Sequence, residues 1–143
     1  KQEYEYWIRK PEKEMIDDKN AIDDSVTPIV NAGLAKFVND DYVVDEHVRF
    51  IPTPGHTPHH VSIEIASQGK MAIITGDVMH HPCQIVHQDW TTPADTYPDL
   101  TIETRKKFIN AVKDQDVLVI GSHFANPVAG KVVRSKSVFV FKV

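Results

Sequence analysis

The order of apolar and polar positions along the chain predicts a protein that mixes helices with strands. Residues 3–10 and 101–113 have the spacing of short amphipathic helices. A third helix is expected over residues 28–38, because Pro28 suits a first helical position. Residues 61–65 alternate between apolar and polar side chains, as a half-buried strand does. The other predicted strands are 42–44, 48–51, 71–75, 116–120, 131–134 and 137–142.

Two segments lack this periodicity and are predicted to be loops. Residues 52–58 hold three prolines and one glycine, which favour turns over regular structure. Residues 80–98 also hold three prolines and few periodic apolar positions. Irregular segments of this length are usually either functional or disordered, so the second loop is a candidate for a functional role.

Residues of metal-binding type follow three of the predicted strands. His56 follows the strand that ends at residue 51, Asp77 follows the one that ends at residue 75, and His123 follows residues 116–120. Each residue taken singly has an ordinary interpretation, as a solvated histidine or a turn aspartate. Together they place two imidazoles and one carboxylate at one sheet edge, where side chains from distant positions form a cleft. This set of groups suits zinc or iron.

Composition narrows the possible functions. The chain has 143 residues, 41% hydrophobic and 25% charged, which is typical of a soluble domain or of half of a larger one. Its net charge of −4, without a basic stripe, disfavours nucleic-acid binding. Its single cysteine, Cys83, excludes an intrachain disulfide.

No apolar run approaches the ~20 residues that span a bilayer, and the chain does not begin with a signal-peptide pattern. A cytoplasmic protein without membrane contact is therefore expected.

Three short motifs are similar to those of a known family. Residues 52–60 read Pro-Thr-Pro-Gly-His-Thr-Pro-His-His, residues 75–77 read Thr-Gly-Asp, and residues 121–124 read Gly-Ser-His-Phe. In this order they resemble the C-terminal half of the metallo-β-lactamase fold superfamily, and most closely its lactonase, esterase and organophosphate-hydrolase branch. The resemblance covers most of the chain from about Asp24 onward. It implies an α/β (α+β) fold, namely the C-terminal half of an αββα sandwich, with one mixed sheet and flanking helices.

The resemblance assigns roles to the three residues that follow strands. His56 matches the histidine that binds the first metal, and His123 matches the histidine that binds the second. Asp77 matches the aspartate that bridges the two metals, and it is the expected catalytic residue. Zinc is the implied metal, with two ions in the complete enzyme and with iron or manganese as alternatives. Whether this chain by itself holds a metal stays open.

Other histidines near these motifs have weaker assignments. His60 matches a histidine of the first motif that is usually not a ligand, and His59 replaces a glycine that is common there. His80 and His81 follow Asp77 where related hydrolases keep residues that line the pocket. Contact with the metal ligands or with substrate is one interpretation of these two, and a solvated loop is the other.

One family motif is absent from the sequence. The H-x-H-x-D-H string, which in the family gives two ligands to each metal, does not occur in the chain. The remaining residues offer two ligands per metal, whereas a catalytic zinc site usually has three from the protein. Residues 1–143 are therefore interpreted as a single domain that forms the C-terminal half of the fold.

The resemblance implies a hydrolase in which a hydroxide activated by two metals attacks a lactone, ester or related bond of a small molecule. The fragment alone is expected to be inactive.

Two alternatives stay open. The chain could be a non-catalytic fragment that folds as a homodimer, or binds a partner, through the sheet face that the other half of the sandwich would cover. It could also form one weak mononuclear zinc or iron site from His56, Asp77 and His123.

Overall fold

The computed structural model describes residues 1–10 and 21–143, which fall into two compact units, Lys1–Asn39 and Asp40–Val143. The first unit contains α1 (Gln2–Arg9), the π-helical turn η2 (Ile22–Val26) and α3 (Thr27–Asn31). The helix predicted over residues 3–10 is confirmed. The helix predicted over residues 28–38 is wrong beyond Asn31, because Gly33 adopts a left-handed conformation (φ +69°) that ends it. That residues 1–143 act as a single domain stays a prediction.

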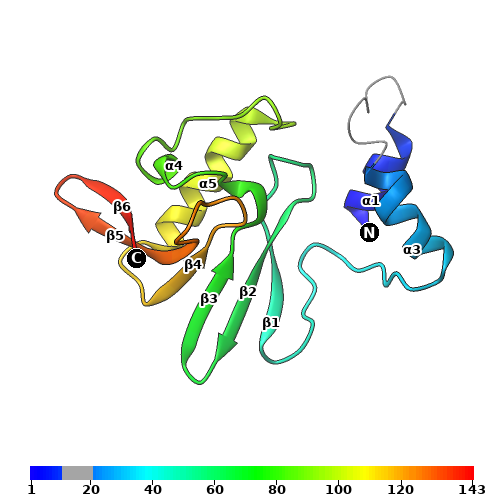
Figure 1. The fold of residues 1–143 in the computed structure, drawn as a ribbon, viewed down its shortest axis with the longest axis horizontal. Coiled ribbons are helices and arrows are strands. Elements are labelled where there is room, and N and C mark those ends of the chain that lie inside the picture. The colour runs from blue at the N-terminus through cyan, green and yellow to red at the C-terminus, as the bar shows by residue number, and fades with distance from the viewer. Residues whose placement is uncertain (11–20) are drawn as a thin grey trace. The chain divides into compact units, whose positions relative to one another are not determined.

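The second unit is built on one mixed sheet of six strands, whose spatial order is their order in the sequence (Figure 1). The parallel pair is β3 with β4, and the other neighbours are antiparallel. The predicted fold class, one mixed sheet with flanking helices, is confirmed. The strands are β1 (Val48–Pro52), β2 (Val61–Ser67), β3 (Lys70–Ile74), β4 (Val117–Ile120), β5 (Ala129–Ser135) and β6 (Val138–Lys142).

The strand predicted over residues 42–44 is wrong. This segment contributes only an isolated bridge between Val43 and Arg49. The carboxylate of Asp45 accepts hydrogen bonds from the backbone N–H groups of His47 and Val48, so the chain turns back at once. Beyond the turn, the segment pairs with β1 through the hydrogen bond from Phe50 N–H to the Tyr42 carbonyl at 2.9 Å, and the pairing stops there, so no ladder forms.

Helix α5 (Pro98–Val112) packs against one side of this sheet (Figure 1). Its buried positions recur every three or four residues, which is the spacing of one helix face. They are Thr101, Thr104, Arg105, Phe108, Ile109 and Val112. Together with Ile73, Val119 and Val132 of the sheet, the apolar members of this face belong to the hydrophobic core. Burial of each such Val, Ile or Phe side chain stabilises the fold by about 1.5–3 kcal/mol.

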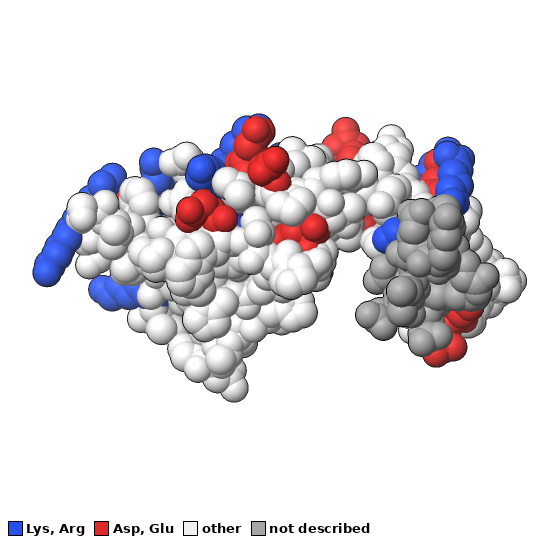
Figure 2. Space-filling model, turned by 90° about the horizontal axis from the view of Figure 1, so that it is seen from above, with Lys and Arg blue, Asp and Glu red and all other residues white. Residues whose placement is uncertain are grey.

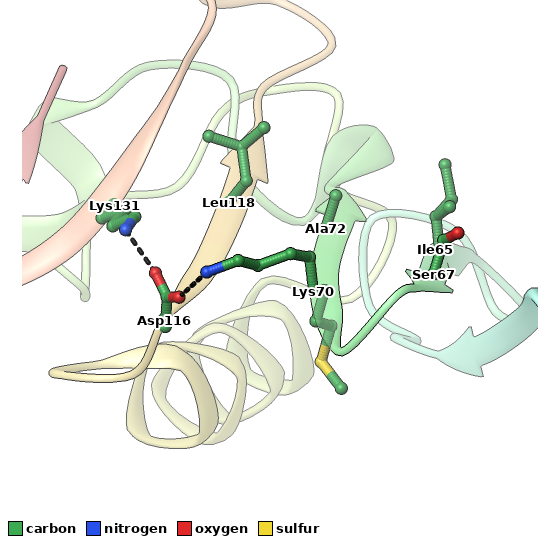
Figure 3. Close-up of a pocket in the computed structure, with 8 residues that line it drawn as sticks. Ile65, Ser67, Lys70, Ala72, Asp116, Leu118 and Lys131 are labelled. Atoms are coloured by element: carbon green, nitrogen blue, oxygen red, sulfur yellow. Dashed lines mark hydrogen bonds and ion pairs between the residues drawn. The ribbon is translucent and has the colours of Figure 1, made fainter.

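On the strands, the residues that alternate with these core positions line a depression of about 390 Å³ (Figure 3). Ile65, Ala72 and Leu118 form its apolar lining, and Leu118 is 38% exposed. The carboxylate of Asp116 accepts a hydrogen bond from Lys70 at 2.8 Å and another from Lys131 at its rim. This side of the sheet is therefore apolar in its middle and charged at one end.

Replacing Asp116 by asparagine should reduce stability in a pH-dependent way. Hydrogen bonds from Lys131 and Lys70 lower the pKa of Asp116 to about 2, whereas an unfolded chain has about 3.9. The carboxylate therefore stabilises the fold above about pH 4 and loses this contribution as the pH falls towards about 2. The Asp116→Asn variant should have a slightly lower unfolding temperature at pH 7, and the difference should vanish in acid. The exposed Asp41 gives the control variant Asp41→Asn. A difference that stays constant down to pH 2 would contradict the assignment.

Charges are mixed on the surface. On the face seen in Figure 2, uncharged side chains cover most of the Asp40–Val143 unit, and Lys and Arg side chains lie mainly towards the end that carries β5 and β6. In the described part of the chain, no helix combines the length and apolar character needed to cross a bilayer.

Candidate metal centre

The sheet topology places the three predicted ligands at one edge. Strands β1 and β3 both pair antiparallel with β2, and β3 pairs parallel with β4, so β1, β3 and β4 run in the same direction. Their carboxyl ends therefore meet at one edge of the sheet. His56 follows β1, Asp77 lies in the short 3-10 turn η3 (Gly76–Val78) after β3, and His123 follows β4.

The carboxylate of Asp77 lies between two imidazoles. Its Oδ1 is 2.7 Å from Nε2 of His123, and its Oδ2 is 3.6 Å from Nε2 of His56. The His56 side chain is 14% exposed, while that of His123 is 55% exposed. The two oxygens of one carboxylate thus face two different histidines, one half-enclosed and one open to solvent.

His80 joins this group, although the sequence singled it out only as a residue near the pocket. Asp77, His80 and His123 offer ligand atoms that lie within 4.8 Å of one another. The His80 ring stacks on His123 at a centroid distance of 5.1 Å and lies 5.0 Å from the ring of His56. Burial lowers the pKa of His80, and the neighbouring His56 lowers it further. A neutral imidazole therefore lies beside Asp77, and it has a free electron pair for a cation.

His60 lies behind Asp77 and has a role that the sequence did not specify. The backbone N–H of Asp77 donates to Nε2 of His60 at 2.8 Å. Because a backbone N–H only donates, Nε2 carries no proton and Nδ1 carries it, facing the carbonyl of Thr53 at 3.1 Å. The electron pair of Nε2 is used to hold the Asp77 backbone, so His60 is not available as a ligand through this atom.

Gly76 is required for this contact between His60 and the backbone of Asp77. It has a φ of +57°, and an added Cβ would lie 2.4 Å from Nε2 of His60. Both the left-handed backbone and the close approach of the ring therefore depend on glycine.

His81 is separate from the clustered residues. It is exposed, and its Nδ1 accepts a hydrogen bond from the backbone N–H of Cys83 at 3.1 Å. Cys83 begins the short helix α4 (Cys83–Val86) inside the segment that was predicted to be a loop throughout. Its exposure fits a solvated loop residue, and a contact of His81 with substrate stays a prediction.

Two buried charged residues near the site were missed by the sequence analysis. Asp95 lies in the long loop, and its Oδ1 is 3.2 Å from Nδ1 of His56. Arg105 of α5 is fully buried and donates to the backbone carbonyls of Val78 and Gln88 at 2.9 and 3.1 Å, and also to that of Trp90. Burial lowers the pKa of Arg105. An isolated acid in a loop and a lone arginine in a helix carry no spacing signal that would have marked them.

Residues 2–123 match the family model of the metallo-beta-lactamase superfamily. The chain belongs to this superfamily. No match was found among curated proteins. The motif-based resemblance is therefore confirmed at the level of the superfamily.

Solved structures of superfamily proteins have the same fold. The dizinc quorum-quenching lactonase AidC, in complex with a product, superposes with a TM-score of 0.76 at 22% identity over 98% of this chain. The hydrolase AbOPH gives 0.79 at 18% identity over 95% of this chain. An N-acyl homoserine lactone hydrolase, with its product bound at the catalytic metal center, gives 0.55 at 24% identity over 64% of this chain.

The match covers only part of those proteins. The chain spans 51% of AidC, 49% of AbOPH and 36% of the third structure. The present chain therefore corresponds to about half the length of AidC and of AbOPH.

Proposed function

We propose that this chain supplies the C-terminal metal ligands of a two-metal hydrolase. His56 would bind one metal, His123 the other, and Asp77 both. The supporting observation is the position of Asp77, whose Oδ2 faces His56 at 3.6 Å and whose Oδ1 faces His123 at 2.7 Å. A carboxylate that offers one oxygen to each of two histidines has the arrangement of a bridging ligand.

The chemistry of these side chains fits zinc. Imidazole nitrogens and carboxylate oxygens are ordinary zinc ligands, and iron or manganese also accepts them. His123 Nε2 and Asp77 Oδ1 are 2.7 Å apart, and a small separation of the two atoms would let both bind one cation in place of the proton that they share. Each metal would have two ligands from this chain and would need at least one more from elsewhere. An H-x-H-x-D-H segment is the ligand source that we propose for the complete protein.

Bound metals would supply Lewis acidity and a lowered pKa for water, which are the needs of hydrolysis at neutral pH. The residues of this chain would hold and orient that site. Asp77 is the carboxylate of the candidate cluster, and we also propose it as the acceptor of a proton during the reaction. His80, kept neutral by burial, adds no positive charge that would repel a cation. Residues 80–98 leave the site at His80 and return to it at Asp95, and we propose that they border the substrate pocket.

The proposed substrate is a lactone or another small ester. Two of the similar structures are lactonases with product present, which supports a cyclic ester. Fold similarity alone does not determine a substrate within this superfamily.

Adding the missing half should produce a metal-dependent hydrolase. We expect the chain, combined with an H-x-H-x-D-H half taken from a superfamily relative, to hydrolyse an N-acyl homoserine lactone, and we expect the chain alone to have no activity. Removal of metal with a chelator should abolish hydrolysis, and zinc should restore it. Lactone opening releases a proton, so a pH-indicator assay measures it. A reassembled protein that binds zinc at full occupancy but hydrolyses neither lactones nor aryl esters would contradict the proposal.

The apolar depression on the sheet supports a second candidate, association of the chain with itself. Ile65, Ala72 and Leu118 offer an apolar surface, and exposed apolar patches favour association. The reassembly mixture distinguishes the two cases. A homodimer that persists when the other half is present favours this candidate, and a one-to-one complex favours the hydrolase.

A further inference from the structure

The most deeply buried carboxylate next to the site belongs to Asp95. Its side chain is 0% exposed, and both of its oxygens have partners. Oδ1 faces Nδ1 of His56 at 3.2 Å, and Oδ2 accepts the backbone N–H of Thr92 at 2.8 Å. A buried carboxylate is costly unless such donors compensate for lost water. Asp95 is therefore a buried acid whose side-chain partner is the imidazole of His56.

Backbone contacts fix this carboxylate against His56. The N–H of Thr96 donates to the carbonyl of His56, and the N–H of Tyr97 donates to the carbonyl of Gly55, both at 2.9 Å. These two bonds tie the segment directly after Asp95 to the backbone at His56. Main-chain hydrogen bonds thus fix the backbone next to Asp95, and the bond from the Thr92 N–H to Oδ2 orients its carboxylate.

The preceding part of the loop is anchored separately. Arg105 donates to the carbonyls of Gln88 and Trp90, so α5 holds the segment that leads towards Thr92. Asp95 therefore lies between two fixed stretches of backbone. Little freedom remains for its side chain to leave His56.

This geometry decides which nitrogen of His56 carries the proton. A carboxylate only accepts hydrogen bonds, so Nδ1 must donate to Asp95, and in the neutral ring Nε2 then keeps its electron pair. Nε2 is the atom that faces Asp77 at 3.6 Å. Histidines that bind metals usually donate their other N–H to a carboxylate in this way, which fixes the tautomer and raises ligand strength.

His80 gives an internal contrast. Its Nδ1 is buried and has no hydrogen-bond partner among the described residues. Its ring is held by burial and by stacking on His123. Of His56 and His80, His56 is the one whose Nδ1 faces a carboxylate within hydrogen-bond distance.

We propose that Asp95 is a positioning residue that locks His56 in its Nδ1–H tautomer and presents Nε2 to a metal. The metal part of this inference rests on the proposed function, whereas the tautomer is a property of the metal-free chain. The two parts can therefore fail independently.

Asp95→Asn gives a sharp test, because the new amide has one oxygen for two donors. The backbone N–H of Thr92 cannot give up its proton, so the oxygen should accept from Thr92 and the NH₂ group should face His56. The imidazole should then lose its Nδ1 proton and switch to the Nε2–H tautomer. Asp89→Asn is the matched control, since Asp89 is exposed in the same loop and the charge change is identical.

Long-range ¹H–¹⁵N correlation spectra of the metal-free chain, labelled at histidine, report the tautomer directly. We expect Nδ1–H for His56 in the unmodified chain and in Asp89→Asn, and Nε2–H in Asp95→Asn. Asp95→Ala, which removes the acceptor without supplying a donor, should give a mixture. An Nε2–H ring in the unmodified chain, or an unchanged ring in Asp95→Asn, would overturn the inference.

Zinc titration of the same variants, each combined with the H-x-H-x-D-H half of a superfamily relative, tests the metal part. Asp95→Asn should bind zinc about 10–100-fold more weakly than Asp89→Asn, which is the usual effect of losing such a partner. Equal zinc affinities, with the tautomer switched, would overturn the claim that Asp95 serves the metal site. If no variant binds zinc but the tautomer switches, the tautomer lock stands and the proposed metal ligation by the chain fails.

Discussion

Replacing Arg105 by methionine should lower the free energy of unfolding by about 3 kcal/mol, the largest stability loss expected from a single change outside the hydrophobic core. Arg105 is 0% exposed and donates to the carbonyls of Val78, Gln88 and Trp90. A hydrogen bond from a charged group contributes about 1.5–3 kcal/mol, and a carbonyl left unpaired in the interior adds a further cost. Methionine keeps most of the volume but none of the donors.

Part of this loss is offset, because burial of the guanidinium is itself costly. Burial lowers the pKa of Arg105, which indicates that its charge is poorly solvated. Methionine removes that cost, so the expected net effect stays near 3 kcal/mol and not near the sum of three charged hydrogen bonds. For a chain of this size the unfolding temperature should fall by about 10 °C.

Lys106→Met is the matched control for Arg105→Met. Lys106 is the next residue of α5 and is exposed, so its loss should change stability by less than about 0.5 kcal/mol. Chemical denaturation of both variants measures the difference. Equal losses would mean that the buried guanidinium does not anchor the loop.

The elements that carry the predicted ligands were predictable from local pattern. Strands β3 and β4 are short, mainly apolar runs with a glycine within two residues of their ends, and each is followed within three residues by Asp77 or His123. Once two strands are parallel, their ends meet at one edge, so proximity of the two residues follows from topology. Local sequence carries this information because strand periodicity and glycine turns are short-range features.

The partners of these ligands were not predictable in the same way. Asp95 lies 39 residues from His56, and an irregular loop connects them. The conformation of this loop depends on tertiary hydrogen bonds from Arg105. The periodicity of apolar residues does not predict such bonds. The joining of His80 to Asp77 depends on the 3-10 turn η3, which the sequence showed only as a glycine followed by an aspartate. Contacts between residues that irregular backbone connects could therefore be found only in the structure.

Replacing Asp77 by alanine should have the largest effect on the site. The change removes the oxygens that face His56 and His123, and with them the proposed shared ligand. The backbone N–H of residue 77 can still donate to His60, so the strand end should keep its conformation. We expect the zinc affinity of the reassembled protein to fall by more than about 100-fold. This exceeds the usual loss when only a residue that hydrogen-bonds to a metal ligand is removed. Lactone hydrolysis by the reassembled protein should fall to the level of the metal-free protein.

The number of zinc ions held by the reassembled protein tests the central claim most directly. Mass spectrometry under native conditions counts the ions in the unmodified protein, in Asp77→Ala and in the control Asp89→Asn. We predict two ions in the unmodified protein and in the control, and loss of the pair in Asp77→Ala, because one carboxylate serves both metals. Two ions in all three proteins would show that Asp77 is not the shared ligand and would contradict the account.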